Sequence, residues 1–274
     1  MGMLKKDDGW RLADEIWSQM SPLLPPRKPY IKGGHNPRVP DRSAMNAIFF
    51  VLRTGAQWNS LNGTGICSNS SAYRRFREWL DAGVFEQFWC IGLLALNTMD
   101  GIDWSWLAMD GAMTKAPLGG GKIGPNPTDR GKGGVKRSVL TAHGIPLAVV
   151  IDGANRHDMK LVKPTLEDLK LDRPVPSMTA PQGLYMDKEY DYVEVRDLVA
   201  ELGFTIHIRS RGEEARQLKR ETGERARRWV VERVHSWMNR FRRLLVIRWK
   251  KGRIPILPLS TSPAASLLGV QPVY

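Results

Sequence analysis

The chain has 274 residues and a formal net charge of +13 at pH 7, which favours a polyanionic partner such as nucleic acid. Its two cysteines exclude a disulfide framework and a cysteine-rich zinc site. No apolar stretch approaches the roughly 20 residues that cross a bilayer, and the N-terminus lacks the apolar run of a signal peptide. We therefore expect a cytoplasmic, nucleoid-associated protein with no membrane partner.

Residues 10–98 are predicted to be helical. Asp41 is a candidate N-cap for a run of apolar residues at helical spacing. A second amphipathic run follows, with aromatic residues on one face and Arg74, Arg75 and Arg77 off that face. The two runs predict either a helix-turn-helix-like unit that presents these arginines to DNA, or a helical bundle with solvated arginines.

From Ile102 the pattern changes to that of an α/β domain, which we expect over residues 102–250. The predicted order is strand, hairpin, helix, strand, helix, strand and helix. The corresponding ranges are 102–109, 135–142 with 145–152, 158–169, 183–186, 192–202, 204–208 and 224–249. This order matches the ribonuclease-H-like fold, a mixed sheet with flanking helices.

Three carboxylates are candidates for chemistry. Asp110 and Asp187 each follow a predicted strand, and strand ends in open sheets border a shared crevice. Glu232 is the single acid among ten Lys and Arg between residues 225 and 251, on a helix that can reach this crevice. Each acid taken alone is more often a cap or an ion-pair partner. Three acids together would repel one another unless cations bind, and oxygen ligands favour Mg²⁺ or Mn²⁺.

The predicted chemistry is phosphodiester cleavage and joining. Two divalent ions activate a water or a 3′-hydroxyl and stabilise the leaving oxygen of a phosphodiester. A G-x-G-x-x-G string at 119–124 is followed by Pro125 and Pro127 in place of a helix, so we expect no nucleotide cofactor.

Positive charge is concentrated near the C-terminus, where residues 213–274 carry 14 Lys and Arg against 5 acids. We expect phosphate contacts from this segment and from the Gly- and Lys-rich region before the hairpin. The predicted contacts are Lys132, Lys136, Arg137, Arg228, Arg233, Arg240, Arg242 and Arg243.

The sequence resembles bacterial insertion-sequence DDE transposases of families four and five. The motifs that carry the resemblance are Leu23-Leu-Pro-Pro, Val51-Leu-Arg-Thr-Gly55, Asn126-Pro-Thr-Asp-Arg-Gly-Lys132 and Arg228-Trp-Val-Val-Glu232. The resemblance extends from about residue 10 to residue 250. It implies a catalytic, metal-binding triad of Asp110, Asp187 and Glu232 with two Mg²⁺ or Mn²⁺ ions. It also implies action on double-stranded DNA, at element ends and target, by a homo-oligomer.

The chain departs from this family at several positions. The family's helix signature is Tyr, Arg, Glu and Lys, and here Arg225 and Asn239 replace the Tyr and the Lys, with Arg240 as a substitute cation. Glu189 stands where the family commonly has Gly. Residues 254–274 lack charge and helical period, as a frameshifted gene or a species-specific tail would. Two alternatives therefore stay open: a catalytically dead remnant that only binds DNA, and a metal-dependent nuclease without strand transfer.

Overall fold

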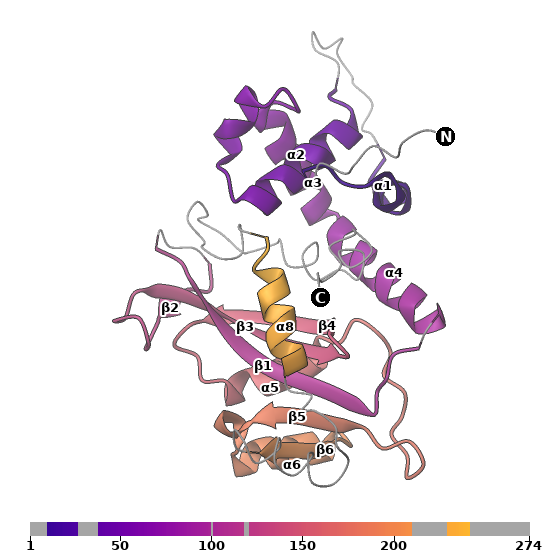
Figure 1. The fold of residues 1–274 in the computed structure, drawn as a ribbon, viewed down its shortest axis with the longest axis vertical. Helices are drawn as coiled ribbons and strands as arrows, with labels where there is room; N and C mark the ends of the chain where they lie inside the picture. Colours follow the sequence, from indigo (N-terminus) through magenta and orange to yellow (C-terminus); the bar gives the residue numbers. More distant parts are fainter. Residues whose placement is uncertain (1–9, 27–37, 100, 118–120, 210–228, 242–274) are drawn as a thin grey trace. The chain divides into compact units, whose positions relative to one another are not determined.

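A computed structural model describes residues 10–26, 38–99, 101–117, 121–209 and 229–241 (Figure 1). The described residues form two compact units. One comprises the residues up to Gly92 together with Arg240 and Phe241, and the other runs from Leu93 to Asn239. The tail at 254–274 lies outside the described residues.

The first unit is helical, as predicted. Its elements are α1 (Asp14–Met20), η1 (Ser21–Leu23), α2 (Asp41–Thr54), η2 (Trp58–Gly63), α3 (Asn69–Asp81) and the first part of α4 (Val84–Met99). Helix α2 ends at Gly55, whose φ of +69° suits a residue without a side chain. Asp41 is the first residue of α2 and not its N-cap, because Pro40 holds that position; its carboxylate instead accepts a hydrogen bond from Arg38 at 2.9 Å. The apolar residues expected on one face, Met45, Ile48, Phe49 and Leu52, are all buried.

Helix α3 buries part of the predicted aromatic face, and its packed stripe is shifted toward Ala72 and Arg75. Its buried residues are Ala72, Arg75, Phe76 and Trp79, which are spaced as one helical stripe, whereas Tyr73 is exposed. Arg75 therefore lies on the packed face and forms an ion pair with Glu78. The expectation that all three α3 arginines lie off the packed face is wrong for this one.

The second unit is built on a mixed sheet. Its strands are β1 (Trp106–Lys115), β2 (Gly124–Pro125), β3 (Gly133–Ala142), β4 (Ile145–Gly153), β5 (Gly183–Asp187) and β6 (Thr205–Arg209). The long strands lie in the order β4-β3-β1-β5-β6, and the short β2 also pairs with β3. Pairings of β3 are antiparallel, and β1–β5 and β5–β6 are parallel. The predicted ribonuclease-H-like mixed sheet with flanking helices is confirmed.

Strand β1 differs from the prediction at both ends. It begins at Trp106 and continues past Asp110 to Lys115, because β3 pairs with it along that whole length. The parallel pairing with β5 stops earlier, at Ala108 and Tyr185. Asp110 therefore lies inside β1, at the place where one neighbouring strand ends and the other continues.

Helices cover both faces of this sheet. They are α5 (Met159–Glu167), η3 (Lys188–Tyr190), α6 (Val193–Glu201) and α8 (Trp229–Met238). Helix α8 lies over β1 and β3 (Figure 1), while α5 packs on β3 and β4. Successive residues of β3 show that these helices lie on opposite faces: Lys136 bonds to Asp158 beside α5, and Arg137 bonds to Asn239 beside α8.

Within the described part of the chain, no single helix is long and apolar enough to cross a membrane. Helices α3 and α4 meet that length and composition only as a pair, bent by 60°.

Candidate active site

Two of the three predicted carboxylates occupy equivalent positions on adjacent strands. Asp110 lies two residues beyond Ala108 in β1, and Asp187 lies two residues beyond its partner Tyr185 in β5. Because side chains alternate along a strand, both aspartates belong to the face that carries Ala108 and Tyr185. These two residues pack in one cluster with Val230 of α8, so the face is the one that α8 covers. We call Asp110 and Asp187 the aspartate pair.

The two carboxylates of the pair are held alike. The backbone N–H of Gly111 donates to Asp110 Oδ1 at 2.8 Å, and the N–H of Lys188 donates to Asp187 Oδ1 at 2.5 Å. Both aspartates are half-buried. A backbone donor next to each carboxylate fixes the position of one of its oxygens.

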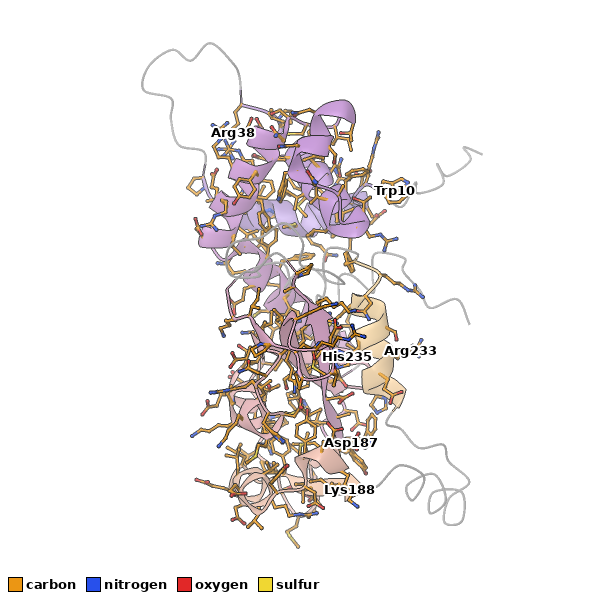
Figure 2. The ribbon with its side chains drawn as sticks, turned by 90° about the vertical axis from the view of Figure 1, so that its left-hand side faces the viewer. Trp10, Arg38, Asp187, Lys188, Arg233 and His235 are labelled. Atoms are coloured by element: carbon orange, nitrogen blue, oxygen red, sulfur yellow. The ribbon has the colours of Figure 1, made fainter. Side chains whose placement is uncertain are left out.

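The third carboxylate, Glu232, is exposed on α8. It lies one helical turn before His235, and residues three apart are neighbours on a helix. The His235 ring is buried next to the backbone of Asp110. Figure 2 shows His235 and Arg233 on α8, and Asp187 and Lys188 at the end of β5. Among the residues with described positions, no three His, Cys, Asp or Glu side chains stand close enough to hold one metal ion. The fold therefore brings two carboxylates together and puts the third on the helix over the same face, without closing the triad.

Tyr190 reports the electrostatic field near the pair. Its side chain is 1% exposed, and its hydroxyl has no hydrogen-bond partner among the described residues. Burial is the first cause that raises the pKa of this phenol well above its ordinary value, and the negative charges of Asp158, Asp110, Glu189 and Asp187 raise it further. The negative charges of several carboxylates therefore reach this one buried phenol.

Glu189 contributes one of these negative charges, and its backbone φ is not positive. A glycine, which the family commonly has at this position, tolerates a positive φ that strains a residue with a side chain. Among the described residues, the non-glycine positions with positive φ are Lys122, Arg130 and His143, and Glu189 is not one of them.

Lys136 of β3 and Asp158 form a buried ion pair that packs against Gly111 of β1, on the face opposite the aspartate pair. Lys136 Nζ donates to Asp158 Oδ2 at 2.5 Å, and both side chains are largely buried. A Cβ atom at Gly111 would lie under 3.0 Å from Asp158 Oδ1 and 3.5 Å from the Tyr190 hydroxyl oxygen. The close approach of Asp158 therefore leaves little room for a side chain next to Asp110. The sequence pattern did not indicate a role for Asp158 or Tyr190. Lys136, which bonds to Asp158, is 22 residues away in the chain, and Gly111, which lies near the Tyr190 hydroxyl, is farther still from Tyr190.

The cations predicted to contact DNA differ in their exposure. The side chains of Arg74, Arg77, Lys132, Arg233 and Arg240 are exposed. Those of Arg75, Lys136 and Arg137 are buried. The remaining predicted contacts, Arg228, Arg242 and Arg243, lie outside the described residues. The buried cations hold packed positions and do not offer their charge to solvent, because β3 is covered on both faces and Arg75 lies on the packed side of α3.

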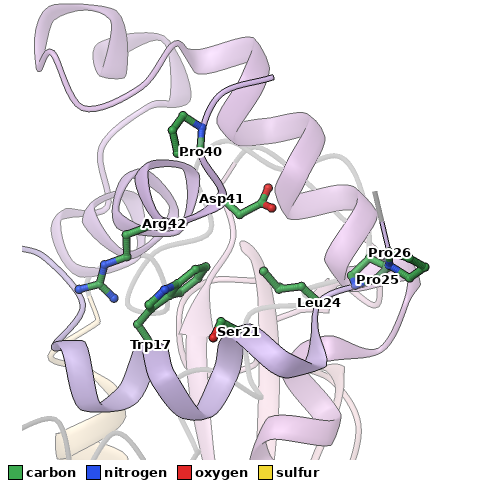
Figure 3. Close-up of a pocket in the computed structure, with 8 residues that line it drawn as sticks. All are labelled: Trp17, Ser21, Leu24, Pro25, Pro26, Pro40, Asp41 and Arg42. Atoms are coloured by element: carbon green, nitrogen blue, oxygen red, sulfur yellow. The ribbon is translucent and has the colours of Figure 1, made fainter. Parts of the chain in front are cut away.

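The first unit contains a pocket of about 470 Å³ (Figure 3). Its lining residues are Trp17, Ser21, Leu24, Pro25, Pro26, Pro40, Asp41 and Arg42. Both charged groups in this wall have intramolecular partners: Arg38 bonds to Asp41, and Arg42 pairs with Asp14 at 2.7 Å while its guanidinium lies 5.5 Å from the Trp17 ring centroid.

A mixed sheet with this strand order and flanking helices is the fold that the sequence predicted for a protein acting on nucleic acid. Comparison with known families agrees. Residues 105–253 match the family described as "Transposase DDE domain", and residues 12–89 match the one described as "Putative transposase of IS4/5 family". The chain therefore belongs to the DDE transposases of the IS4/5 type.

Relatives are found in Burkholderia cepacia. The "Insertion element IS402 uncharacterized 16.2 kDa protein" is 39% identical over 120 residues, which are 42% of this chain and 80% of the relative. The "Putative transposase for insertion sequence element IS402" is 36% identical over 128 residues, which are 46% of this chain and 58% of the relative. Among solved structures, the Mos1 Strand Transfer Complex matches with 10% identity and a TM-score of 0.33, covering 89% of this chain and 74% of that one.

Proposed function

We propose that this chain cleaves the ends of an insertion sequence and transfers them to target DNA, with Asp110, Asp187 and Glu232 as its metal-binding carboxylates. One observation carries the proposal: the aspartate pair occupies equivalent positions on adjacent parallel strands, under the helix that bears Glu232. Carboxylate oxygens on neighbouring strands and on the helix that covers them are the donors that a hard divalent cation prefers.

The proposed cofactor is Mg²⁺ or Mn²⁺, two ions for each site. When bound, such ions make a bound water or hydroxyl a better nucleophile and stabilise the leaving oxygen. The protein itself orients the carboxylate oxygens that would bind these ions. Backbone N–H groups hold one carboxylate oxygen of Asp110 and one of Asp187, and His235, packed beside the Asp110 backbone, links α8 to β1.

The proposed macromolecular partner is double-stranded DNA, bound by a homo-oligomer in the cytoplasm. On α3, Arg74 and Arg77 remain available as phosphate contacts; the nearest acid to Arg77 is Asp81 at 3.7 Å on an exposed surface, where ion pairs are weak. Helices α2 and α3 pack together with η2 between them in the chain, an arrangement that supports a helix-turn-helix-like role. Lys132, Arg233 and Arg240 are the exposed candidates elsewhere in the chain.

The test uses the inverted-repeat ends that flank the gene, labelled and incubated with the purified protein and Mg²⁺. A transposase yields cut ends and then products joined to a second DNA. Cutting without joined products would replace the proposal with a metal-dependent nuclease. Binding without cutting, in Mg²⁺ and in Mn²⁺, would leave only a DNA-binding remnant.

A further inference from the structure

Arg137 has an unusual environment for an arginine. It lies on β3 opposite Ala112, on the face that α8 covers, and its side chain is 4% exposed. Burial lowers the pKa of its guanidinium to about 10, with no acid among the described residues to offset this effect. A buried cation without a carboxylate is costly unless other groups compensate it.

The compensating groups lie at the C-terminal end of α8. Arg137 Nη2 donates to Asn239 Oδ1 at 3.0 Å, and Nη1 lies 4.0 Å from the sulfur of Met238. The carbonyl end of a helix carries a partial negative charge that attracts cations. A buried guanidinium here therefore holds the last turn of α8 against β3. The Arg137 Nε–H is buried and has no hydrogen-bond partner among the described residues. The hydrogen bond to α8 is therefore made by the Nη2 end of the guanidinium.

The contact continues along α8 toward Glu232. Asn239 donates its backbone N–H to the carbonyl of His235 at 3.0 Å, and His235 lies one turn after Glu232. The three residues are spaced by four and three, so they share one flank of the helix. The His235 ring is buried between the charge of Arg137 and the backbone of Asp110. Displacement of the last turn would therefore move the flank that carries Glu232.

We infer that Arg137 is a positioning residue, which fixes α8 through Asn239 and thereby sets Glu232 over the aspartate pair. This inference rests on the proposed function for the role of Glu232. It also accounts for the Asn at position 239, where the resembled helix signature has Lys. A lysine would place a second cation against the buried guanidinium, whereas the amide oxygen of Asn239 accepts its hydrogen bond.

The first experiment measures the docking of α8 by hydrogen exchange of the whole chain, without metal or DNA. Arg137→Met should speed exchange of the α8 amides by about tenfold or more and leave α5 and β5 unchanged. Asn239→Leu removes the acceptor without altering the sheet, so it should act in the same direction. Arg196→Met, an exposed arginine on α6, is the matched control. Unchanged exchange in α8, or an equal rise throughout the unit, would overturn the inference.

The second experiment asks whether Arg137 acts through Glu232. Mn²⁺ affinity is measured by electron paramagnetic resonance at a temperature at which every variant is folded. Arg137→Met should weaken binding by about tenfold, as loss of outer-shell support does for metal sites. In the Glu232→Gln background the same change should have no further effect. An equal loss in both backgrounds would refute action through Glu232. If the unaltered chain bound no Mn²⁺, the proposed function would fail, and the exchange data would still decide whether Arg137 positions α8.

Discussion

Asp110 and Asp187 lie at equivalent positions of two parallel strands, and the N–H group of the next residue donates to each carboxylate. Under the proposed function, this correspondence lets each aspartate offer a fixed carboxylate oxygen to the same ion. It also separates them from Glu232, which is exposed on a helix and depends on the docking of that helix.

The first prediction follows from this correspondence. Asp110→Asn, Asp187→Asn and Glu232→Gln should each lower the rate of Mg²⁺-dependent cleavage by more than about 100-fold, the upper range for loss of even an outer-shell partner. Binding of labelled element ends should persist, because each change removes only the charge of a metal ligand. Asp191→Asn is the control, since that acid pairs with Arg196 at the surface. Cleavage at a near-normal rate would remove the altered residue from the triad.

The sequence predicts the order of the elements because apolar runs identify the strands. It also singles out Asp110 and Asp187 as acids near the predicted strand ends, but β1 continues past Asp110 to Lys115 through its pairing with β3. The burial of Lys136 and Arg137 is different. Lys136 bonds to Asp158, 22 residues away, and Arg137 bonds to Asn239, 102 residues away. A basic pair beside a Gly- and Lys-rich loop has the same local pattern whether its charges reach solvent or lie under two helices. Only the register of β3 between β1 and β4 distinguishes these cases.

A second prediction concerns Gly111. The Cβ of Gly111→Ala would lie under 3.0 Å from Asp158 Oδ1, so the carboxylate must move and the ion pair with Lys136 must loosen. We expect a loss of about 1–3 kcal/mol in the free energy of unfolding, the usual cost of overpacking. Denaturant titration measures it. Gly63→Ala is the matched control, since its Cβ would meet no atom within 4 Å. Equal stability of the two variants would show that Asp158 moves aside freely.

A third prediction concerns the buried ion pair. Lys136→Met leaves the Asp158 carboxylate without its partner in a largely buried place, so unfolding should become easier by about 3–5 kcal/mol. The double variant Lys136→Met with Asp158→Leu should recover part of this loss, because no buried charge then remains. Lys163→Met breaks an exposed pair with Glu167 at 3.8 Å and should change stability by no more than about 0.5 kcal/mol. A similar small effect at Lys136 would mean that water reaches the pair.

The last prediction is a pH dependence that arises from His235. Burial, followed by the charge of Arg137, lowers the pKa of this imidazole from 6.5 to about 4, while the unfolded chain keeps the ordinary value. Between these two pH values the unfolded state binds the proton and the folded state does not. The free energy of unfolding is therefore intact above pH 6.5, falls by about 3 kcal/mol as the pH drops to 4, and loses nothing more from this group below that. His235→Leu should remove this part of the slope, as measured by denaturant titrations across pH 4–7 and compared with the unaltered chain. His157→Gln, at an exposed histidine, should keep the full slope. If the difference between His235→Leu and the unaltered chain did not change across this window, the folded and unfolded chains would bind the proton alike, and burial under α8 would not lower the pKa of His235.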